Sequence, residues 1–166
     1  MDRVEKVREV VDNILLNMTD VVERRCAYIH LYGVAQACAM LAMKRGADIE
    51  LAVVAGMLHD IYSYVTMDSL DHVHKSAGMS RDILEKVGAF SKDEIEKVCE
   101  AIYNHSDKDK MQGTLDEILK DADVMQHCLY NPLFPIKEHE KLRWEKLKVE
   151  MGMVLIPVSV LPGGKV

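Results

Sequence analysis

The hydrophobic positions of this chain follow the repeat of an α-helix from its first residues onward. The opening segment places them at steps of three and four, with charged residues between them, at Val4, Val7, Val11, Ile14 and Met18. The same pattern predicts helices over about 20–44, 48–61, 71–87 and 91–105, then from 114 onward and over about 138–150. No segment shows the sustained alternation of a half-buried strand. The sequence therefore predicts an all-α fold.

Residues that favour helix ends mark the boundaries of these segments. Gly46 and Gly88 each follow a predicted helix, where a left-handed residue commonly ends one. Ser91-Lys-Asp-Glu94 and Thr114-Leu-Asp-Glu117 have the spacing of a capping box, in which two side chains satisfy backbone donors reciprocally. These signals divide the chain into short helices joined by tight connections.

The length of 166 residues indicates one domain. We expect a bundle of six or seven helices over residues 1–152, followed by an apolar C-terminal tail over residues 153–166. The apolar character of the tail favours docking, either on the core or on a second subunit in a homodimer.

The composition excludes several classes of protein. With 21 basic and 27 acidic residues, the formal net charge is −6, which argues against binding to duplex nucleic acid or to an anionic membrane. The apolar run over 153–161 has about half of the ~20 residues that a membrane-spanning helix needs. The four cysteines form no C-x-x-C pair, and the charged N-terminal segment lacks the apolar core of a signal peptide. We therefore expect a cytoplasmic protein with reduced thiols.

The first chemical signal lies at the end of the third predicted helix. Residues 51–58 are apolar or glycine on every side, which predicts near-complete burial, and His59 and Asp60 follow directly. A carboxylate there is disfavoured both by desolvation and by the negative end of the helix dipole. Because the nearest basic residues in sequence are Arg45 and Lys75, the compensating cation must come from elsewhere. A metal ion bound by the imidazole and the carboxylate together is the simplest candidate.

Three further histidines occupy positions that face the predicted core. His30 lies among small apolar residues of the second helix, and His105 follows the apolar face of the fifth. His74 lies on the side of the fourth helix that contains Ala77 and Gly78. Independent core histidines, as in a plain helical bundle, would each need a separate buried partner, whereas one shared metal site would satisfy all of them.

The sixth predicted helix contributes the last carboxylate. Asp121 and Asp123 are two residues apart and must point to different faces, so we expect Asp123 in the core and Asp121 in solvent. The remaining histidines, His72, His127 and His139, are expected at the surface or in supporting positions.

The order of these residues resembles the pattern of the HD-domain superfamily of metal-dependent phosphohydrolases. That pattern consists of a histidine, a later His-Asp pair and a final aspartate, on a bundle of helices. Four residues match it: His30, His59, Asp60 and Asp123. The resemblance spans about residues 27–126, and it implies that His74 and His105 are additional ligands in a two-metal site in which Asp60 bridges the ions.

The resemblance implies a phosphohydrolase that cleaves a phosphomonoester or phosphodiester of a nucleotide or a similar small phosphate, with a metal-activated hydroxide as the nucleophile. Its cofactors would be one or two divalent ions, and the imidazole-rich ligands favour iron, manganese, zinc, cobalt or nickel over magnesium. Asp60 would be catalytic, and Lys75 and Lys108 are candidates for catalysis and for binding phosphate oxygens. Many members have a second acid or base soon after the His-Asp pair, whereas Ile61-Tyr-Ser-Tyr64 follows here.

Two other functions stay open at this point. The same ligands would suit a di-iron centre that activates O₂, a chemistry that the resemblance also allows. Alternatively, the protein is a metal-binding sensor or assembly module without turnover, which would be marked by a saturated coordination sphere.

Overall fold

A computed structural model describes residues 2–153, and every regular element among these residues is helical. The elements are α1 (Arg3–Leu16), α2 (Val21–Arg45), α3 (Ile49–Leu58), α4 (Ile61–Thr66), α5 (His72–Val87), α6 (Lys92–Asn104), α7 (Thr114–Tyr130), the 3₁₀ turn η1 (Glu138–Glu140) and α8 (Lys141–Glu150). The prediction of an all-α fold is confirmed. The tail expected over 153–166 lies, from residue 154 onward, outside the described residues.

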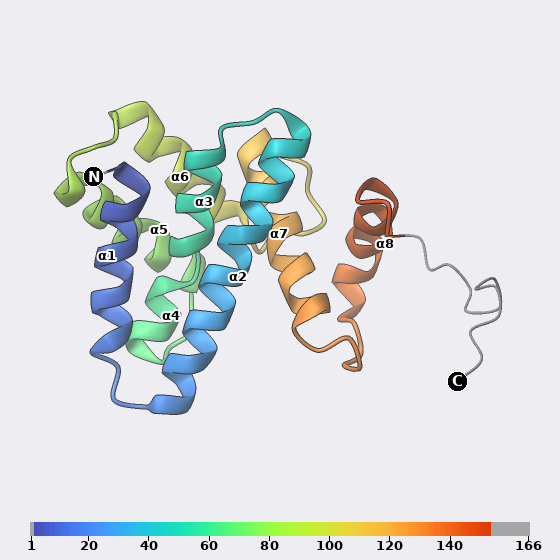
Figure 1. The fold of residues 1–166 in the computed structure, drawn as a ribbon, viewed down its shortest axis with the longest axis horizontal. Coiled ribbons are helices and arrows are strands. Elements are labelled where there is room, and N and C mark those ends of the chain that lie inside the picture. The colour runs from blue at the N-terminus through green and yellow to red at the C-terminus, as the bar shows by residue number, and fades with distance from the viewer. Residues whose placement is uncertain (1, 154–166) are drawn as a thin grey trace, which may run out of the picture.

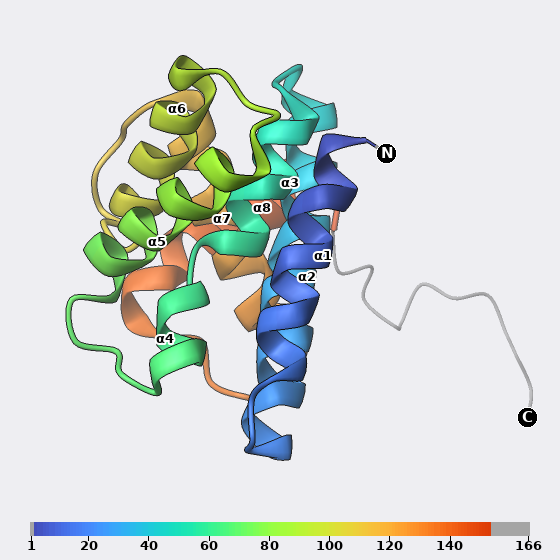
Figure 2. The same ribbon diagram turned by 90° about the vertical axis from the view of Figure 1, so that its left-hand side faces the viewer.

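The helices are arranged around α2, which packs against α3 and α7 (Figure 1). α6 contacts α3, α5 and α7, and completes the bundle behind them (Figure 2). α1 lies at one edge of the molecule and α8 at the opposite edge, beside α7. α3 and α7 contact each other, and each of them contacts both α2 and α6, so these four helices surround the centre of the molecule.

α2 is long and apolar because it is the central helix of the bundle. By length and composition alone, it is the one helix of the described region that would be able to cross a membrane. Its buried residues include Leu31, Val34 and Leu41, which belong to the hydrophobic core shared with α3 and α7. Core packing therefore accounts for the hydrophobicity of α2.

Side-chain caps explain where several helices begin. Asp20 accepts hydrogen bonds from the backbone N–H groups of Val22 and Glu23 at 2.8 and 3.0 Å. The capping box predicted at Ser91 and Glu94 is confirmed, because each side chain accepts a hydrogen bond from the backbone N–H of the other residue.

The capping box predicted at Thr114 and Glu117 is wrong. α7 begins directly after Gly113, and the N-cap residue makes no side-chain hydrogen bond. The Glu117 carboxylate instead forms ion pairs with Lys120 and Arg143, at 2.9 and 2.8 Å. A charged, largely buried network outcompetes the local cap for this carboxylate.

The third predicted helix ends three residues earlier than its hydrophobic pattern indicates. α3 stops at Leu58, and Asp60 leaves the helical conformation with φ −117° and ψ 16°. The chain then starts a new short helix, α4, at Ile61. The break therefore falls within the His59-Asp60 pair: His59 keeps helical backbone angles, and the chain leaves the helical path at Asp60.

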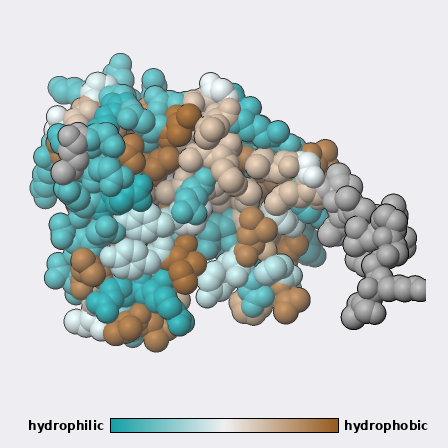
Figure 3. Space-filling view, in the orientation of Figure 1, coloured by the Kyte–Doolittle hydropathy of each residue, from teal (hydrophilic) through white to brown (hydrophobic). Residues whose placement is uncertain are grey.

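The face shown in Figure 3 combines a hydrophilic and an apolar part. Teal surface covers much of α1, and tan and brown surface runs across α2 and α7. A groove between α2 and α7 is lined by apolar residues that include Ile29, Met40 and Leu129. Ile29 also lines a second cavity, which contains His30 and Asp60, so this apolar surface continues toward these two residues.

α2 and α3 cross at very short range at Gly56. A Cβ atom at this position would lie 2.6 Å from the Cα atom and 2.8 Å from the backbone nitrogen of Ala35. Both are backbone atoms, so relief requires the helices to move apart. Since His30 lies on α2 and His59 directly follows α3, this crossing also sets the distance between their side chains.

We expect Gly56→Ala to lower the free energy of unfolding by about 1–3 kcal/mol, because the added methyl group overpacks the helix crossing. Gly78→Ala is the matched control, since Gly78 is also inside a helix but nothing lies within 4 Å of the position of its Cβ. That substitution should raise stability by roughly 0.5–1 kcal/mol through helix propensity. Urea unfolding of the two variants tests the expectation, and equal effects would contradict it.

Candidate metal centre

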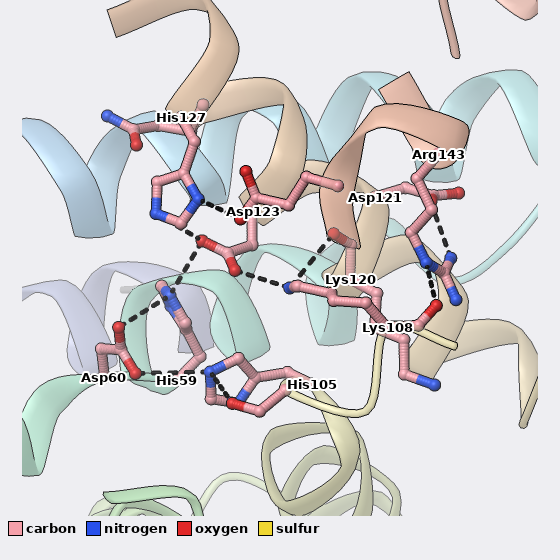
Figure 4. A network of polar contacts seen from close by, with 12 residues as sticks. His59, Asp60, His105, Lys108, Lys120, Asp121, Asp123, His127 and Arg143 are labelled. Atoms are coloured by element: carbon pink, nitrogen blue, oxygen red, sulfur yellow. Dashed lines mark hydrogen bonds and ion pairs between the residues drawn. The ribbon is translucent and has the colours of Figure 1, made fainter. Parts of the chain in front are cut away.

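A cluster of histidine and aspartate side chains lies where α2, α3, α5, α6 and α7 approach one another. Figure 4 shows five of its members, from the α3–α4 break, the end of α6 and α7, turned toward one common space. Three overlapping groups place one ligand atom of each member within 4.8 Å of the others: His30, His59 and Asp60; His30, Asp123 and His127; and Asp60, His72 and His105.

Three of the histidines share one orientation, in which Nδ1 is hydrogen-bonded to backbone and Nε2 faces the cluster. Nδ1 of His59, His72 and His105 lies 2.8, 3.2 and 2.6 Å from the carbonyl oxygen three residues earlier. A carbonyl oxygen only accepts hydrogen bonds, so Nδ1 must hold the proton of the neutral ring. Each Nε2 therefore presents a lone pair to the cluster, as a metal ligand must.

The shortest contact in the cluster joins two such nitrogens. Nε2 of His30 lies 3.0 Å from Nε2 of His59, and Nδ1 of His30 lies 2.8 Å from Oε1 of Gln126. Two lone pairs facing each other at this distance repel, so the contact requires a proton or a metal cation between them. Asp60 Oδ2 lies 3.5 and 3.6 Å from these two nitrogens, and Asp123 Oδ1 lies 3.6 and 3.9 Å from them.

These contacts between imidazole nitrogens and carboxylate oxygens, from 3.0 to 3.9 Å, are close to the spacing of adjacent ligands around one divalent ion. With metal–ligand bonds of about 2.1 Å, adjacent ligands lie about 3.0 Å apart in octahedral and about 3.4 Å apart in tetrahedral coordination. Among the described residues, Oδ1 of Asp60 and Oδ1 of Asp123 are buried side-chain oxygens without a hydrogen-bond partner. Burial of such an atom without a partner is unfavourable. A cation between His30 and His59 would supply the partner of Asp123 Oδ1, whereas Asp60 Oδ1 faces the second group of histidines.

A second group of ligand atoms lies on the other side of Asp60. Nε2 of His105 lies 3.4 Å and Nε2 of His72 lies 3.7 Å from Asp60 Oδ1. The other carboxylate oxygen, Oδ2, faces His30 and His59. Asp60 therefore divides its two oxygens between two sets of imidazoles, which suits a carboxylate that bridges two ions.

Two buried serines of α5 hold the break that presents Asp60. The backbone N–H of Tyr62 donates to Oγ of Ser76 at 3.3 Å, and Oγ of Ser80 donates to the carbonyl oxygen of Leu58 at 3.5 Å. Both backbone groups are left without a regular helical partner where α3 ends and α4 begins. The two serines thus stabilise the non-helical conformation at Asp60 inside the core, because they satisfy these backbone groups.

The electrostatic environment shifts the pKa values of His30 and His59 in opposite directions. Complete burial lowers the pKa of His59 to about 3, and the neighbouring His30 and His105 act in the same direction against Asp60. Burial also acts to lower the pKa of His30, but Asp60 and Asp123 outweigh it and the net pKa is raised. His59 is therefore neutral at ordinary pH, as a metal-binding imidazole must be.

Both carboxylates remain ionised despite their burial. Burial acts to raise the pKa of Asp60, but His59, His105 and His30 together hold it well below its usual range. Burial has the same effect on Asp123, and Lys108 and His127 are the largest contributions that bring its pKa far below normal. The cluster thus supplies two negative charges for a cation.

Lys108 orients Asp123 within the cluster. Its Nζ atom lies 2.6 Å from Asp123 Oδ2 and is buried, so Oδ1 is left free to face the histidines. The loop that contains Lys108 is anchored by Arg143 of α8, whose Nε donates to the Lys108 carbonyl oxygen at 2.7 Å. Lys108 also lines the cleft described below.

The structure does not bring His74 and Lys75 to the cluster, contrary to the expectation for both. His74 pairs through Nδ1 with Asp71, and its ring contacts that of Tyr103 at a tilted angle, with 48% of its side chain exposed. Lys75 pairs with Asp68 at 3.1 Å. Helix register explains this outcome: the inward face of α5 contains residues 72, 76 and 80, whereas Gly78, on the side expected to face the core, is exposed.

His72 lies where His74 was expected. The signal was present in the sequence, because His72 precedes Ser76 and Ser80 at steps of four, and both serines are fully buried. Asp121 also differs from its expectation: it is buried and pairs with Arg45 and Arg143, at 2.7 and 2.8 Å, rather than facing solvent.

His127 was expected at the surface but belongs to the cluster. Its Nε2 lies 3.4 Å from Asp123 Oδ1, its ring stacks on that of His30, and its Nδ1 lies 2.9 Å from Oε1 of the buried Glu140. The spacing of four residues from Asp123 was the available signal, since it places both on one side of α7. Glu140, which comes from the 3₁₀ turn before α8, had no signal in the sequence pattern.

The cluster opens into a cleft of about 480 Å³. Its lining is rich in hydroxyl, imidazole and amine groups and includes Asp60, Asp123, His72, His105, Ser63, Ser69, Ser106, Lys108, Lys137 and His139. A small polar ligand therefore has access to the ligand atoms of both groups.

Comparison with known proteins agrees with this geometry. The HD-domain family model matches residues 27–127, more than half of the chain, from α2 to the last turns of α7. The chain belongs to the HD-domain family. The crystal structure of a "predicted HD superfamily hydrolase" from an uncultured Thermotogales bacterium, at 1.45 Å resolution, has a similar fold with a TM-score of 0.57 and 20% identity, over 91% of this chain and 86% of that one. Because HD domains bind divalent metal ions and the cluster fits one, family membership supports a metal-dependent hydrolase.

In protein stripped of metal, we expect acid to destabilise the fold through His59. The unfolded chain protonates this histidine near pH 6.5 and the folded chain only near pH 3, so between these values the unfolded state binds more protons. The raised pKa of His30 contributes stability that is complete below pH 6.5, and the lowered pKa values of the aspartates have an effect only below about pH 4. Stability should therefore fall by about 2 kcal/mol between pH 6.5 and pH 5.

Urea unfolding at these two pH values measures the loss. In His59→Gln, which has no titrating group at this position, the difference between the two pH values should be smaller by most of that amount. The same difference in both proteins would contradict the assignment of His59 as a buried neutral imidazole.

Proposed function

We propose that this HD-domain protein is a phosphohydrolase that cleaves a phosphomonoester or phosphodiester of a nucleotide or a similar small phosphate. The observation that supports it most is the division of Asp60 between two sets of histidines, next to a polar cleft. One ion would be held by His30, His59, Asp60 and Asp123. A second would be held by Asp60, His72 and His105, with His72 in place of the His74 that the sequence indicated.

When bound, such ions make a water molecule more acidic and neutralise charge on phosphoryl oxygens. In the hydrolysis, the oxygen of water forms a bond to phosphorus, the bond from phosphorus to the ester oxygen breaks with its electron pair, and the departing oxygen takes up a proton. The residues of the chain bind and orient: Lys108 fixes the direction of Asp123, and the carbonyl acceptors fix the rings of His59 and His105.

With metal ions bound, the cleft would suit an anionic substrate. Lys137 and His139 line it together with the hydroxyl groups of Ser69 and Ser106, and these donors suit the oxygens of a phosphate group. Its lining also holds Glu23 and Glu140, so most of the positive charge for the substrate would come from the ions. Lys108 also lines it, although its short contact with Asp123 gives it a positioning role in the described structure. Lys75, which pairs with Asp68, has no part in this proposal.

The openness of the site argues against a sensor or assembly module with a saturated coordination sphere. Asp60, His72, His105 and Asp123 all line the cleft, so a substrate can approach the ligand atoms directly. A di-iron oxygenase would use the same ligands, and the polar lining of the cleft, with its serine hydroxyl groups, favours the phosphohydrolase over it.

We expect protein purified without chelators to contain about two transition-metal ions per chain and to release phosphate from one member of a phosphate-ester panel. His72→Ala should lose about one ion and most of the activity. His74→Ala, two residues away on the outer face of α5, should retain both ions and the full activity. Asp60→Asn should lower kcat/KM at least about 100-fold, because both ions lose a charged ligand. Elemental analysis and a phosphate-release assay measure these effects.

Equal metal contents in His72→Ala and His74→Ala would contradict the assignment of the second ion. Iron with an oxygen-sensitive spectrum, and no hydrolysis of any ester in the panel, would replace the phosphohydrolase with the oxygenase.

A further inference from the structure

A second cavity, of about 390 Å³, adjoins the polar cleft and is distinctly apolar. Its lining combines α2, the last turns of α7 and the connection from α7 to η1, and its apolar members are Cys26, Ile29, Cys128, Tyr130, Phe134, Pro135 and Ile136. We call this cavity the apolar slot. Among residues 2–153, Lys137 is the only lysine or arginine in its lining, and it also lines the cleft.

The apolar slot and the polar cleft meet at the metal-ligand cluster. Asp60, Tyr64, His127 and Glu140 line both, and His30 lines the slot. The ring of His30 is near those of Tyr64 and His127, with centroid distances of 6.1 and 5.3 Å. A ligand that reaches the ligand atoms from the cleft therefore has an apolar, partly aromatic surface directly beside it.

The rim of the slot has a defined conformation. The backbone N–H of Phe134 donates to the carbonyl oxygen of Asn131 at 2.9 Å, and that of Leu133 donates to Oδ1 of Asn131 at 3.1 Å. Prolines at 132 and 135 restrict the backbone on either side of Phe134. The side chain of Phe134 is nevertheless 62% exposed, so it presents a large apolar surface at the mouth of a pre-formed cavity.

We propose that the apolar slot binds the leaving group of the substrate and selects esters whose leaving group is an aromatic ring or a branched hydrocarbon. This inference rests on the proposed function, since it assigns the phosphate group to the cleft with its lysines, hydroxyls and metal ligands. The division of polar and apolar surfaces then matches the two ends of one molecule. A leaving group that is itself charged or highly hydroxylated gains nothing from the slot, because it would lose hydration against Ile29, Phe134 and Ile136.

The experiment compares two non-hydrolysable phosphonates by calorimetry on protein loaded with Mn²⁺. We expect (1-naphthyl)methylphosphonate to bind at least about tenfold more tightly than methylphosphonate, because burial of the ring in the slot adds to the shared phosphonate contacts. Phe134→Ser and Ile29→Ser should each reduce this preference several-fold and leave the affinity for methylphosphonate unchanged. The two side chains are exposed at the rim, so neither substitution disturbs the core.

Leu133→Ser is the matched control. Leu133 is adjacent to Phe134 and 92% exposed, but it does not line the slot, so its substitution should leave the preference intact. Equal affinities for the two phosphonates in the wild-type protein, or equal effects of Leu133→Ser and Phe134→Ser, would overturn the assignment of the slot.

Thiol labelling gives a readout that does not depend on turnover. Cys26 and Cys128 line the slot and are partly exposed, whereas Cys38 and Cys99 are buried in the core. The naphthyl compound should slow the reaction of Cys26 and Cys128 with N-ethylmaleimide, and methylphosphonate should not. No protection by the naphthyl compound would overturn the inference.

The outcomes separate this inference from the proposed function. Hydrolysis of phosphate esters without any preference for apolar leaving groups would refute the slot and leave the phosphohydrolase intact. Failure of both phosphonates to bind, together with the absence of hydrolysis, would refute both.

Discussion

The structure depends on the mutual approach of two imidazole nitrogens and two carboxylates in a buried space. His30 and His59 present Nε2 atoms 3.0 Å apart, and each ring has a hydrogen-bond acceptor at Nδ1 that keeps the proton away from the contact. Asp60 and Asp123 add two charges that burial alone would neutralise. Each group is unfavourable in isolation, and a divalent cation bound among them would make all four contacts favourable.

The helices around this point serve to hold these groups in place. The backbone approach at Gly56 sets the distance between α2 and α3, and Ser76 and Ser80 accommodate the break at which Asp60 leaves the helix. On the opposite side, Arg143 anchors the loop of Lys108, which in turn orients Asp123. The helix crossing, the serine hydrogen bonds and the Arg143 contact thus fix the positions of these side chains, including those of Asp60 and Lys108, which lie outside the helices.

The sequence predicted the helices and the convergence of His30, His59, Asp60 and Asp123, because both depend on local patterns. Helical periodicity and caps located nearly every helix, and the burial of residues 51–58 pointed to His59 and Asp60. The choice between His72 and His74 failed because small residues were taken to mark the inner face of α5, where the buried serines mark it instead. Glu140 and the apolar slot arise from the return of the chain to α7 after Asn131, a tertiary contact that periodicity does not encode.

Anomalous X-ray diffraction from crystals grown with Mn²⁺ tests the central claim most directly, because it locates the ion relative to each side chain. We expect one manganese peak within bonding distance of Nε2 of His30, Nε2 of His59 and Oδ1 of Asp123. A second peak should lie beside His72 and His105, with Asp60 between the two peaks. Manganese bound only elsewhere on the protein, or these side chains free of it at saturating concentration, would contradict the account.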